Sequence, residues 1–429
     1  MLYVVLMPFM SALAPSEWLP LPLLLLLIAA PAIAMRHDGP TLAQALRADA
    51  GFWAAWLLGC AGMVFSPIPL GGKNLNYAAA ILVSYLMFFV VVRAWLHHRV
   101  VTTASIVAAA HLCLTLLSIA VLIEFYTASF HGIFFADVIH YAHDDLNVAN
   151  LIDADFKRPR AFATEPGFTA LCFECLWPLT MASPRGRPLR HALYAVGFAV
   201  LGSAAALVSL LVGCAVVWVV RRRDLRGLFR AMIVAAVVVP IVASTGTGEE
   251  IAWSVLGRKL DLTTAAVEGG DSAVTVLDRV TTYDTGLALI ESHPAGVGWG
   301  ALGQAFANNA VLPDVGVLRG SGMLSLYLDV GVAAGIAGLV AFLTFIGMRV
   351  RATLRSPHPL AGFLSVALIA LCTHHALVTE LQFPFLWFAL ALADRLQATW
   401  PTRCAPMGYL RSLSSGAGGG AHPTRAIDT

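Results

Sequence analysis

The chain has 429 residues, of which 59% are hydrophobic and 12% are charged, and its mean hydropathy is +0.78. This composition excludes an ordinary soluble domain and predicts an all-α, polytopic membrane protein. The formal net charge of +2 gives no electrostatic reason to expect a nucleic-acid partner.

Runs of apolar residues predict about twelve membrane-spanning helices, because roughly 20 such residues cross the hydrocarbon core. The start of the chain resembles a signal peptide, but it lacks a basic segment, and the run 19–35 is long enough to remain as a span. The run 191–220 is divided at Gly202, since two short helices keep the arginines on both sides of it in the cytoplasm. The predicted spans are 2–14, 19–35, 51–66, 75–96, 100–125, 162–182, 191–203, 205–220, 229–243, 322–348, 359–377 and 381–397.

The charges are unevenly distributed between the two ends of these spans. With both termini in the cytoplasm, most of the 27 basic residues and few of the 25 acidic residues lie on the cytoplasmic side. The polar stretches 126–160 and 244–321 then become periplasmic loops of a single transmembrane domain over residues 1–400. The remainder, residues 401–429, is rich in glycine and serine, and we expect a disordered cytoplasmic tail.

The first periplasmic loop ends in basic residues, which is unusual because positive charge resists export. Arg158 and Arg160 lie at this end, and Glu165 precedes Pro166 at the start of the next predicted span. An acid in this position could be a helix cap paired with an arginine. Ionisable groups at membrane depth are more often functional, so the pattern favours an anion-binding site.

The second periplasmic loop contains an amphipathic segment followed by glycines. Apolar residues recur at helical spacing from Leu277 to Ile290, with Arg279 at the border of the stripe, which predicts a helix lying on the membrane. His293 and the following proline end this helix. Gly296 and Gly298 permit a tight loop, whose exposed N–H groups would suit phosphate oxygens. Considered alone, the loop could be an ordinary turn and the histidine an interfacial residue.

Two acids lie inside predicted spans, Glu124 and Glu174. A transporter would use such residues as proton relays. They are isolated in the sequence, and the paired broken helices of many transporters are not evident.

At these residues the chain resembles the Wzy-type O-antigen and exopolysaccharide polymerases and the related O-antigen ligases. The segment 288–300 is similar to a His/Asn-Pro-x-x-Gly-x-Gly stretch that follows an amphipathic helix in this family. The segment 325–335 is similar to the start of the span after the large loop. Ligases typically carry a His-Asn pair a little before the position of Gly331, where this chain has Gly320-Ser321 preceded by Arg319. The resemblance therefore favours a polymerase over a ligase.

The resemblance implies a metal-independent glycosyltransferase without cofactors, working in O-antigen, capsule or exopolysaccharide synthesis. It would join polyprenyl-diphosphate-linked repeat units on the periplasmic face of the bacterial inner membrane. Its partners would be the lipid-linked glycan donor and acceptor, the lipid bilayer, and a chain-length regulator and a flippase. The alternatives are a ligase that transfers the glycan to lipid A core or protein, and a polysaccharide transporter or flippase.

This chemistry needs cations for the leaving diphosphate and a base for the attacking hydroxyl. We expect Arg160 and Arg279 to bind the diphosphate, because guanidinium forks match phosphate oxygens. Either Glu165 or His293 would take the proton, and the sequence does not choose between them. The other predicted substrate-binding residues are Arg158, Arg319, Gly296 and Gly298.

Overall fold

Helices are the regular secondary structure of the described residues, which otherwise contain only an isolated bridge between Ala12 and Tyr141. Three described helices are long and apolar enough to cross a membrane: Asn74–Leu96, Thr103–His131 and Leu326–Arg355. This architecture agrees with the predicted all-α membrane protein. The computed structural model describes residues 1–16, 19–35, 47–66, 72–98, 100–141, 159–163, 165–183, 188–221, 274–300, 325–378 and 381–398.

The helices follow the predicted apolar runs in most places. The predicted span 229–243 and the predicted tail 401–429 lie outside the described residues. The run from Gly72 to Leu96 is one continuous helical rod, because a π-helical segment, η1, joins α5 to α6. The elements in chain order are α1 (Leu2–Leu6), α2 (Leu21–Met35), α4 (Ala50–Phe65), α5 (Gly72–Ser84), η1 (Tyr85–Val91), α6 (Val92–Leu96), α7 (Thr103–His131), η2 (Phe135–Asp137), α9 (Pro166–Thr180), α10 (Pro188–Val200), α11 (Ala204–Arg221), α15 (Val274–Ser292), α17 (Leu326–Arg355), α18 (Pro359–His374) and α19 (Pro384–Ala398).

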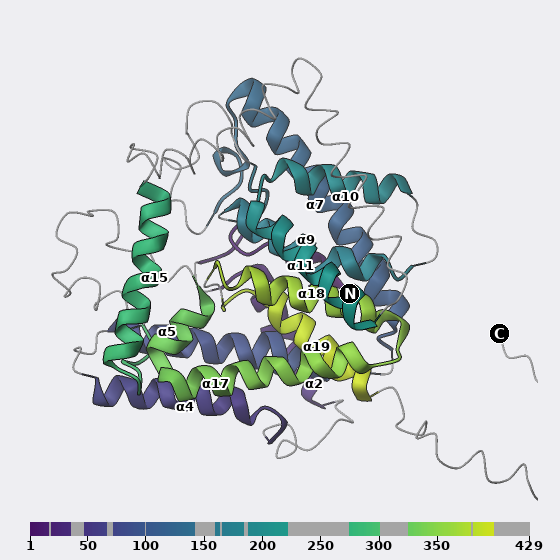
Figure 1. The fold of residues 1–429 in the computed structure, drawn as a ribbon. Helices are drawn as coiled ribbons and strands as arrows, with labels where there is room; N and C mark the ends of the chain where they lie inside the picture. The colour runs from purple at the N-terminus through teal and green to yellow at the C-terminus, as the bar shows by residue number, and fades with distance from the viewer. Residues whose placement is uncertain are drawn as a thin grey trace, which may run out of the picture.

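Two groups of helices meet around α19. In the first, α17 packs along α4, and the two helices lie side by side in Figure 1. In the second, α18 packs between α9 and α11, while α10 packs against α7. Aromatic rings fill the centre of the first group, where Phe52 stacks on Tyr85 with ring centroids 3.8 Å apart and the Trp387 ring of α19 meets both. The core thus joins early and late parts of the chain.

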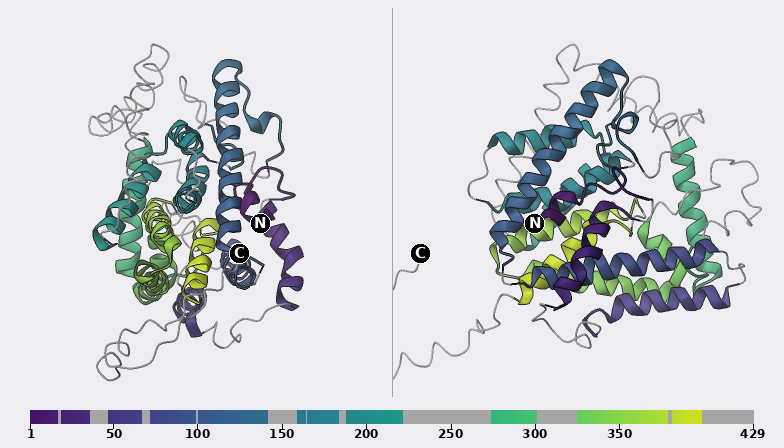
Figure 2. Two further views of the ribbon diagram at one scale, coloured as in Figure 1. Left: turned by 90° about the vertical axis from the view of Figure 1, so that its right-hand side faces the viewer. Right: turned by 180° about the vertical axis from the view of Figure 1, so that it is seen from behind.

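The N-terminal segment departs from its prediction. A span over 2–14 was expected, but the helix ends at Leu6, so this prediction is wrong. Beyond it, the N–H groups of Ser11 and Ala12 donate to the carbonyl oxygen of Phe162. Figure 2 shows this N-terminal part of the chain, in purple, beside α7. Its apolar composition reflects burial against other parts of the chain. The buried side chains are Met7, Met10, Ala12 and Ala14.

Two local predictions are confirmed. The run 191–220 is divided where expected, since α10 ends at Val200 and Gly202 has a φ of 60°, a left-handed conformation that favours glycine. The segment predicted to be helical forms α15, which ends at Ser292, two residues before Pro294, whereas its place on the membrane surface stays a prediction.

A buried ionic network joins four helices. Asp49 precedes α4, Arg93 lies in α6, Arg349 in α17 and Asp394 in α19. Each arginine contacts both aspartates: Arg93 lies 3.0 Å from Asp49 and 3.2 Å from Asp394, and Arg349 lies 3.1 Å from Asp394 and also bonds to Asp49. The four residues thus lie together, as residues at helix ends on one side of a membrane would; the cytoplasmic orientation of this side stays a prediction.

Candidate functional site

The segment before α9 is positioned by a carboxylate from inside α7. Glu124 is buried, and it accepts hydrogen bonds from the backbone N–H groups of Arg160 at 2.8 Å, of Phe135 at 3.1 Å, and of Ala161. Ala161 has a φ of 49°, which L-residues rarely adopt. Strained backbone persists only where the surroundings hold it, and Glu124 provides that support.

Arg160 itself is buried, with 2% of its surface exposed. Its guanidinium carbon lies 4.8 Å from the centre of the Tyr141 ring, within the range of a cation–π contact. The Tyr141 hydroxyl donates to the carbonyl oxygen of Ala161, and the Thr169 hydroxyl of α9 donates to that of Arg160. The arginine predicted to bind diphosphate is therefore held between α7, α9 and the Tyr141 segment.

Glu165 lies at the N-cap position of α9, and Pro166 is the first helical residue. This position agrees with the helix-cap interpretation, although the Glu165 side chain makes no capping hydrogen bond to the first turn. The Glu165 side chain is also exposed, as a residue that meets a substrate requires. Positive partial charge at the helix N-terminus favours an anionic side chain or ligand here, so both interpretations stay open.

Arg279 lies in α15, one helical turn before Tyr283. The Tyr283 hydroxyl donates to the carbonyl oxygen of Ala376, just beyond the end of α18, so this part of α15 is tied to the α18 end. The side chain of Arg279 lies outside the description, as do Arg158 and Arg319. Their proposed contacts with substrate remain predictions.

The loop after α15 fills a break in α17. Gly335 has φ 70° and ψ −175°, so the helix is interrupted there. The N–H of Ile336 donates to the carbonyl oxygen of Pro294 at 3.0 Å. In return, the N–H groups of Val297 and Gly298 donate at 2.9 Å to the carbonyl oxygens of residues 332 and 333. The backbone N–H and carbonyl groups that lose their helical partners at the break are thus hydrogen-bonded to the loop.

The loop glycines allow this close approach to α17 and α4. Gly296 and Gly298 have φ values of 87° and 95°. A Cβ atom on Gly296 would collide with the carbonyl oxygen of Ala333, and one on Gly298 would collide with the backbone of Met63. Since the N–H of Gly298 already binds α17, it is not available to phosphate in this conformation. A donor-binding role of the two glycines stays a prediction.

His293 is half-buried just beyond α15, and its Nδ1 lies 2.9 Å from the Ser292 hydroxyl. No hydrogen bond, ion pair or ring contact in the described part of the chain joins it to Arg160 or Glu165. Figure 1 shows the α4 end of α15, which His293 follows, well separated from α9. The structure therefore brings Arg160 and Glu165 to the start of α9 and leaves His293 in another region.

A second buried acid has a partner that the sequence did not suggest. Oε1 of Glu174 in α9 lies 2.9 Å from Nδ1 of His374 at the end of α18, and both side chains are buried. Glu174 is isolated in the sequence, and no local pattern links it to His374, 200 residues later. An acid in an apolar span needs a polar partner, so Glu174 alone predicts that another span supplies a polar side chain. Within the described residues, no group of three or more His, Cys, Asp or Glu could hold a metal ion.

No curated protein matches this chain. The family model described as O-antigen ligase matches residues 191–343, a range that holds Arg279, His293 and the break at Gly335. Arg160 and Glu165 lie before this range. Over these residues the chain is similar to the O-antigen ligase family, which agrees with the resemblance seen in its sequence.

Proposed function

We propose that this protein is a glycan polymerase that joins polyprenyl-diphosphate-linked oligosaccharide repeat units on the periplasmic face of the inner membrane. The observation that carries the proposal is the position of Arg160 and Glu165 at the start of α9, with the arginine buried and the carboxylate exposed. The superfamily supplies the reaction class, since its members transfer glycans. The lipid carrier as donor is part of the proposal.

In this reaction a hydroxyl of the acceptor sugar attacks the anomeric carbon of the donor. A glycosidic C–O bond forms, the bond from that carbon to the diphosphate oxygen breaks, and the lipid diphosphate leaves. Arg160 and Arg279 would neutralise the charge that develops on the leaving group. Glu165 would take the hydroxyl proton. We favour Glu165 over His293 because it lies five residues from Arg160 in the chain, at the end of a helix that contacts the arginine.

The burial of Arg160 has a consequence for substrate binding. A charge in a water-poor site acts more strongly on phosphate than a charge in bulk solvent does. Because Tyr141 covers the guanidinium, the donor would have to displace this ring to reach it. Arg158 and Arg319 would add phosphate contacts. Gly296 and Gly298 could bind phosphate through their backbone N–H groups only if their loop moved away from α17.

A ligase is the second candidate, favoured by the description of the matching family model. The sequence Arg319-Gly320-Ser321, where ligases typically carry a His-Asn pair, supports the polymerase instead. A transporter would be expected to use the free ends of a broken helix to bind its cargo. The N–H of Ile336 and the carbonyl of Ala333 at the break in α17 are bonded to the chain itself, which argues against that use.

The fate of the glycan separates these candidates. Deletion of the gene should leave single repeat units on the surface glycolipid if the protein is a polymerase. A ligase deletion would instead remove the surface glycan and accumulate long lipid-linked chains. Purified protein supplied with lipid-diphosphate oligosaccharide should produce lengthened chains, and a transporter would leave the oligosaccharide unchanged.

The arginine variants test the site. Arg160→Ala and Arg279→Ala should each lower the rate of chain growth by about 100-fold while the protein still inserts in the membrane, because the leaving diphosphate loses a cation. Lysine at either position should restore part of the rate, since it keeps the charge but not the bidentate geometry. The measurement is product length per unit of purified protein.

A matched control is Arg190→Ala, which removes an exposed arginine of α10 outside the site. It should leave the rate of chain growth unchanged. Normal product length in Arg160→Ala would remove this residue from the catalytic site and with it the main support for the proposal.

A further inference from the structure

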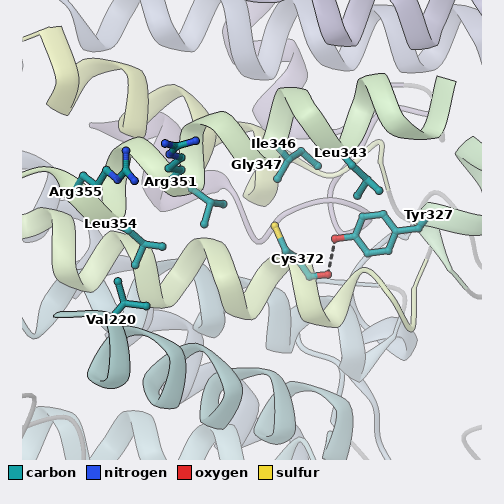
Figure 3. Close-up of a pocket in the computed structure, with 10 residues that line it drawn as sticks. Val220, Tyr327, Leu343, Ile346, Gly347, Arg351, Leu354, Arg355 and Cys372 are labelled. Carbon is teal, nitrogen blue, oxygen red and sulfur yellow. Dashed lines mark hydrogen bonds between the residues drawn. The ribbon is translucent and has the colours of Figure 1, made fainter. Parts of the chain in front are cut away.

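An apolar groove runs along α17, between this helix and the ends of α11 and α18. Its volume is about 510 Å³, within the range of roughly 300–1,000 Å³ found for small-molecule sites. Figure 3 shows Tyr327 at one end of the groove and the two arginines Arg351 and Arg355 at the other. Leu343 and Ile346 line it between these ends. The groove is therefore apolar along most of its length and cationic at one end.

The cationic end is made of exposed side chains. Arg351 and Arg355 are four residues apart in α17 and so share one face of the helix. Among the residues that the structure describes, no carboxylate forms an ion pair with either guanidinium. Their charge is therefore available to an anion at the mouth of the groove.

A third arginine fixes the shape of this end. Arg221, the last residue of α11, donates hydrogen bonds to the carbonyl oxygens of Thr353, Leu354 and Ser356 at the C-terminal end of α17. These bonds satisfy carbonyl groups that the helix end leaves open, and they hold α11 against α17. The groove wall formed by α11 is thus attached to the helix that carries the two free cations.

The rest of the groove is suited to a hydrocarbon chain. The hydroxyl of Tyr327 donates to the carbonyl oxygen of Cys372 at 2.7 Å, which leaves its ring as an apolar surface. Leu343 is 43% exposed and Val220 is 57% exposed, so the groove opens to the side of the molecule. A Cβ atom on Gly347 would meet no atom within 4 Å apart from the neighbouring backbone of its own helix, so the groove has free space beside this glycine.

We propose that this groove binds one anionic glycerophospholipid from the membrane leaflet at the Arg351 end. Its phosphate would lie between Arg351 and Arg355, and one acyl chain would extend past Gly347 toward Tyr327. Charge complementarity selects an anionic over a zwitterionic lipid, since each exposed basic residue near a membrane surface attracts anionic lipids. The inference does not rest on the proposed glycan chemistry, which is placed at the start of α9.

Native mass spectrometry of the purified full-length protein tests this site. Phosphatidylglycerol and phosphatidylethanolamine with the same acyl chains would be titrated separately. The wild-type protein should hold one phosphatidylglycerol about tenfold or more tightly than phosphatidylethanolamine. The double variant Arg351→Ala with Arg355→Ala should bind the two lipids equally, because the charge that distinguishes them is gone. Gly347→Phe, which fills the groove, should weaken the binding of both.

The matched controls change similar residues outside the groove. Val340→Phe enlarges another exposed position of α17, and Arg190→Ala removes another exposed arginine; both should bind phosphatidylglycerol as the wild type does. Equal binding of the two lipids by the wild type would overturn the proposal. So would unchanged phosphatidylglycerol binding in the double variant or in Gly347→Phe. Tighter binding of a polyprenyl phosphate than of phosphatidylglycerol, lost in Gly347→Phe, would assign the groove to a different lipid.

Discussion

Two buried carboxylates organise opposite kinds of structure in this protein. Asp49 is bonded to other side chains, namely the guanidinium groups of Arg93 and Arg349 and the hydroxyl of Tyr85 at 2.8 Å. Glu124 is bonded to backbone N–H groups, among them that of Arg160. The first carboxylate joins helices to one another, while the second shapes a loop.

The difference bears on what each region can do. The network around Asp49 balances two aspartates against two arginines, and each arginine also stacks on the ring of Phe89. Such a closed network is costly to break, because any missing partner leaves a buried charge. Glu124 instead accepts hydrogen bonds from backbone N–H groups around Arg160, so it fixes the course of a loop and does not join helices through charged side chains.

The largest effect is expected from Asp49→Ala. It leaves Arg93 and Arg349 to share the single carboxylate of Asp394 in a largely buried site, so we expect a loss of about 3–5 kcal/mol in the free energy of unfolding. Denaturant unfolding of the purified protein in detergent would measure it. Glu291→Ala, which removes an exposed carboxylate, should stay within about 0.5 kcal/mol of the wild type. If Asp49→Ala changed the free energy of unfolding as little as Glu291→Ala does, the network would not hold the helices together.

A smaller loss of stability is expected from Glu124→Ala. The variant leaves backbone N–H groups around Arg160 without their acceptor, at a cost of about 1–3 kcal/mol, because the loop can partly relax. Chain growth should fall by more than this loss explains, since Arg160 is no longer held in place. Glu124→Gln keeps one carbonyl oxygen and should retain part of the activity. Product length would be measured at matched amounts of folded protein. If chain growth fell only as much as the amount of folded protein did, the role of Glu124 would be purely structural.

The smallest effect is expected from Tyr85→Phe. It removes one hydrogen bond from Asp49 but leaves both arginines in contact, so the free energy of unfolding should fall by only about 1 kcal/mol. Tyr126→Phe is the control, because this ring is exposed on α7. If Tyr85→Phe proved as damaging as Asp49→Ala, the hydroxyl and not the arginines would dominate the network.

Most helices could be predicted because their signals are local. The break at Gly202 and the end of α15 before Pro294 depend on the conformational preferences of single residues. The segment after Leu6 could not be predicted in the same way. It is as apolar as a span, but its backbone bonds to Phe162, which is far away in the chain.

The candidate site was predicted only where charge alone identifies a residue. Arg160 and Glu165 stand out as charges beside an apolar run, and they lie together at α9. The bonds of Glu124 to the Arg160 segment span 36 residues, so no local pattern indicates them. The tight turn at Gly296 was also expected, but the partner of this loop is α17. That partner is set by how α4, α15 and α17 pack.

The position of Trp299 has a consequence for the order in which the molecule is assembled. Its indole N–H donates to the carbonyl oxygen of Trp56 in α4, which precedes it by 243 residues, and its ring lies where Gly59 leaves room. Since the N-terminal part of a chain emerges first from the ribosome, α4 is complete long before the residue that covers it has been synthesised. In the nascent protein, the surface of α4 beside Gly59 therefore stays uncovered until the segment that carries Trp299 has been synthesised.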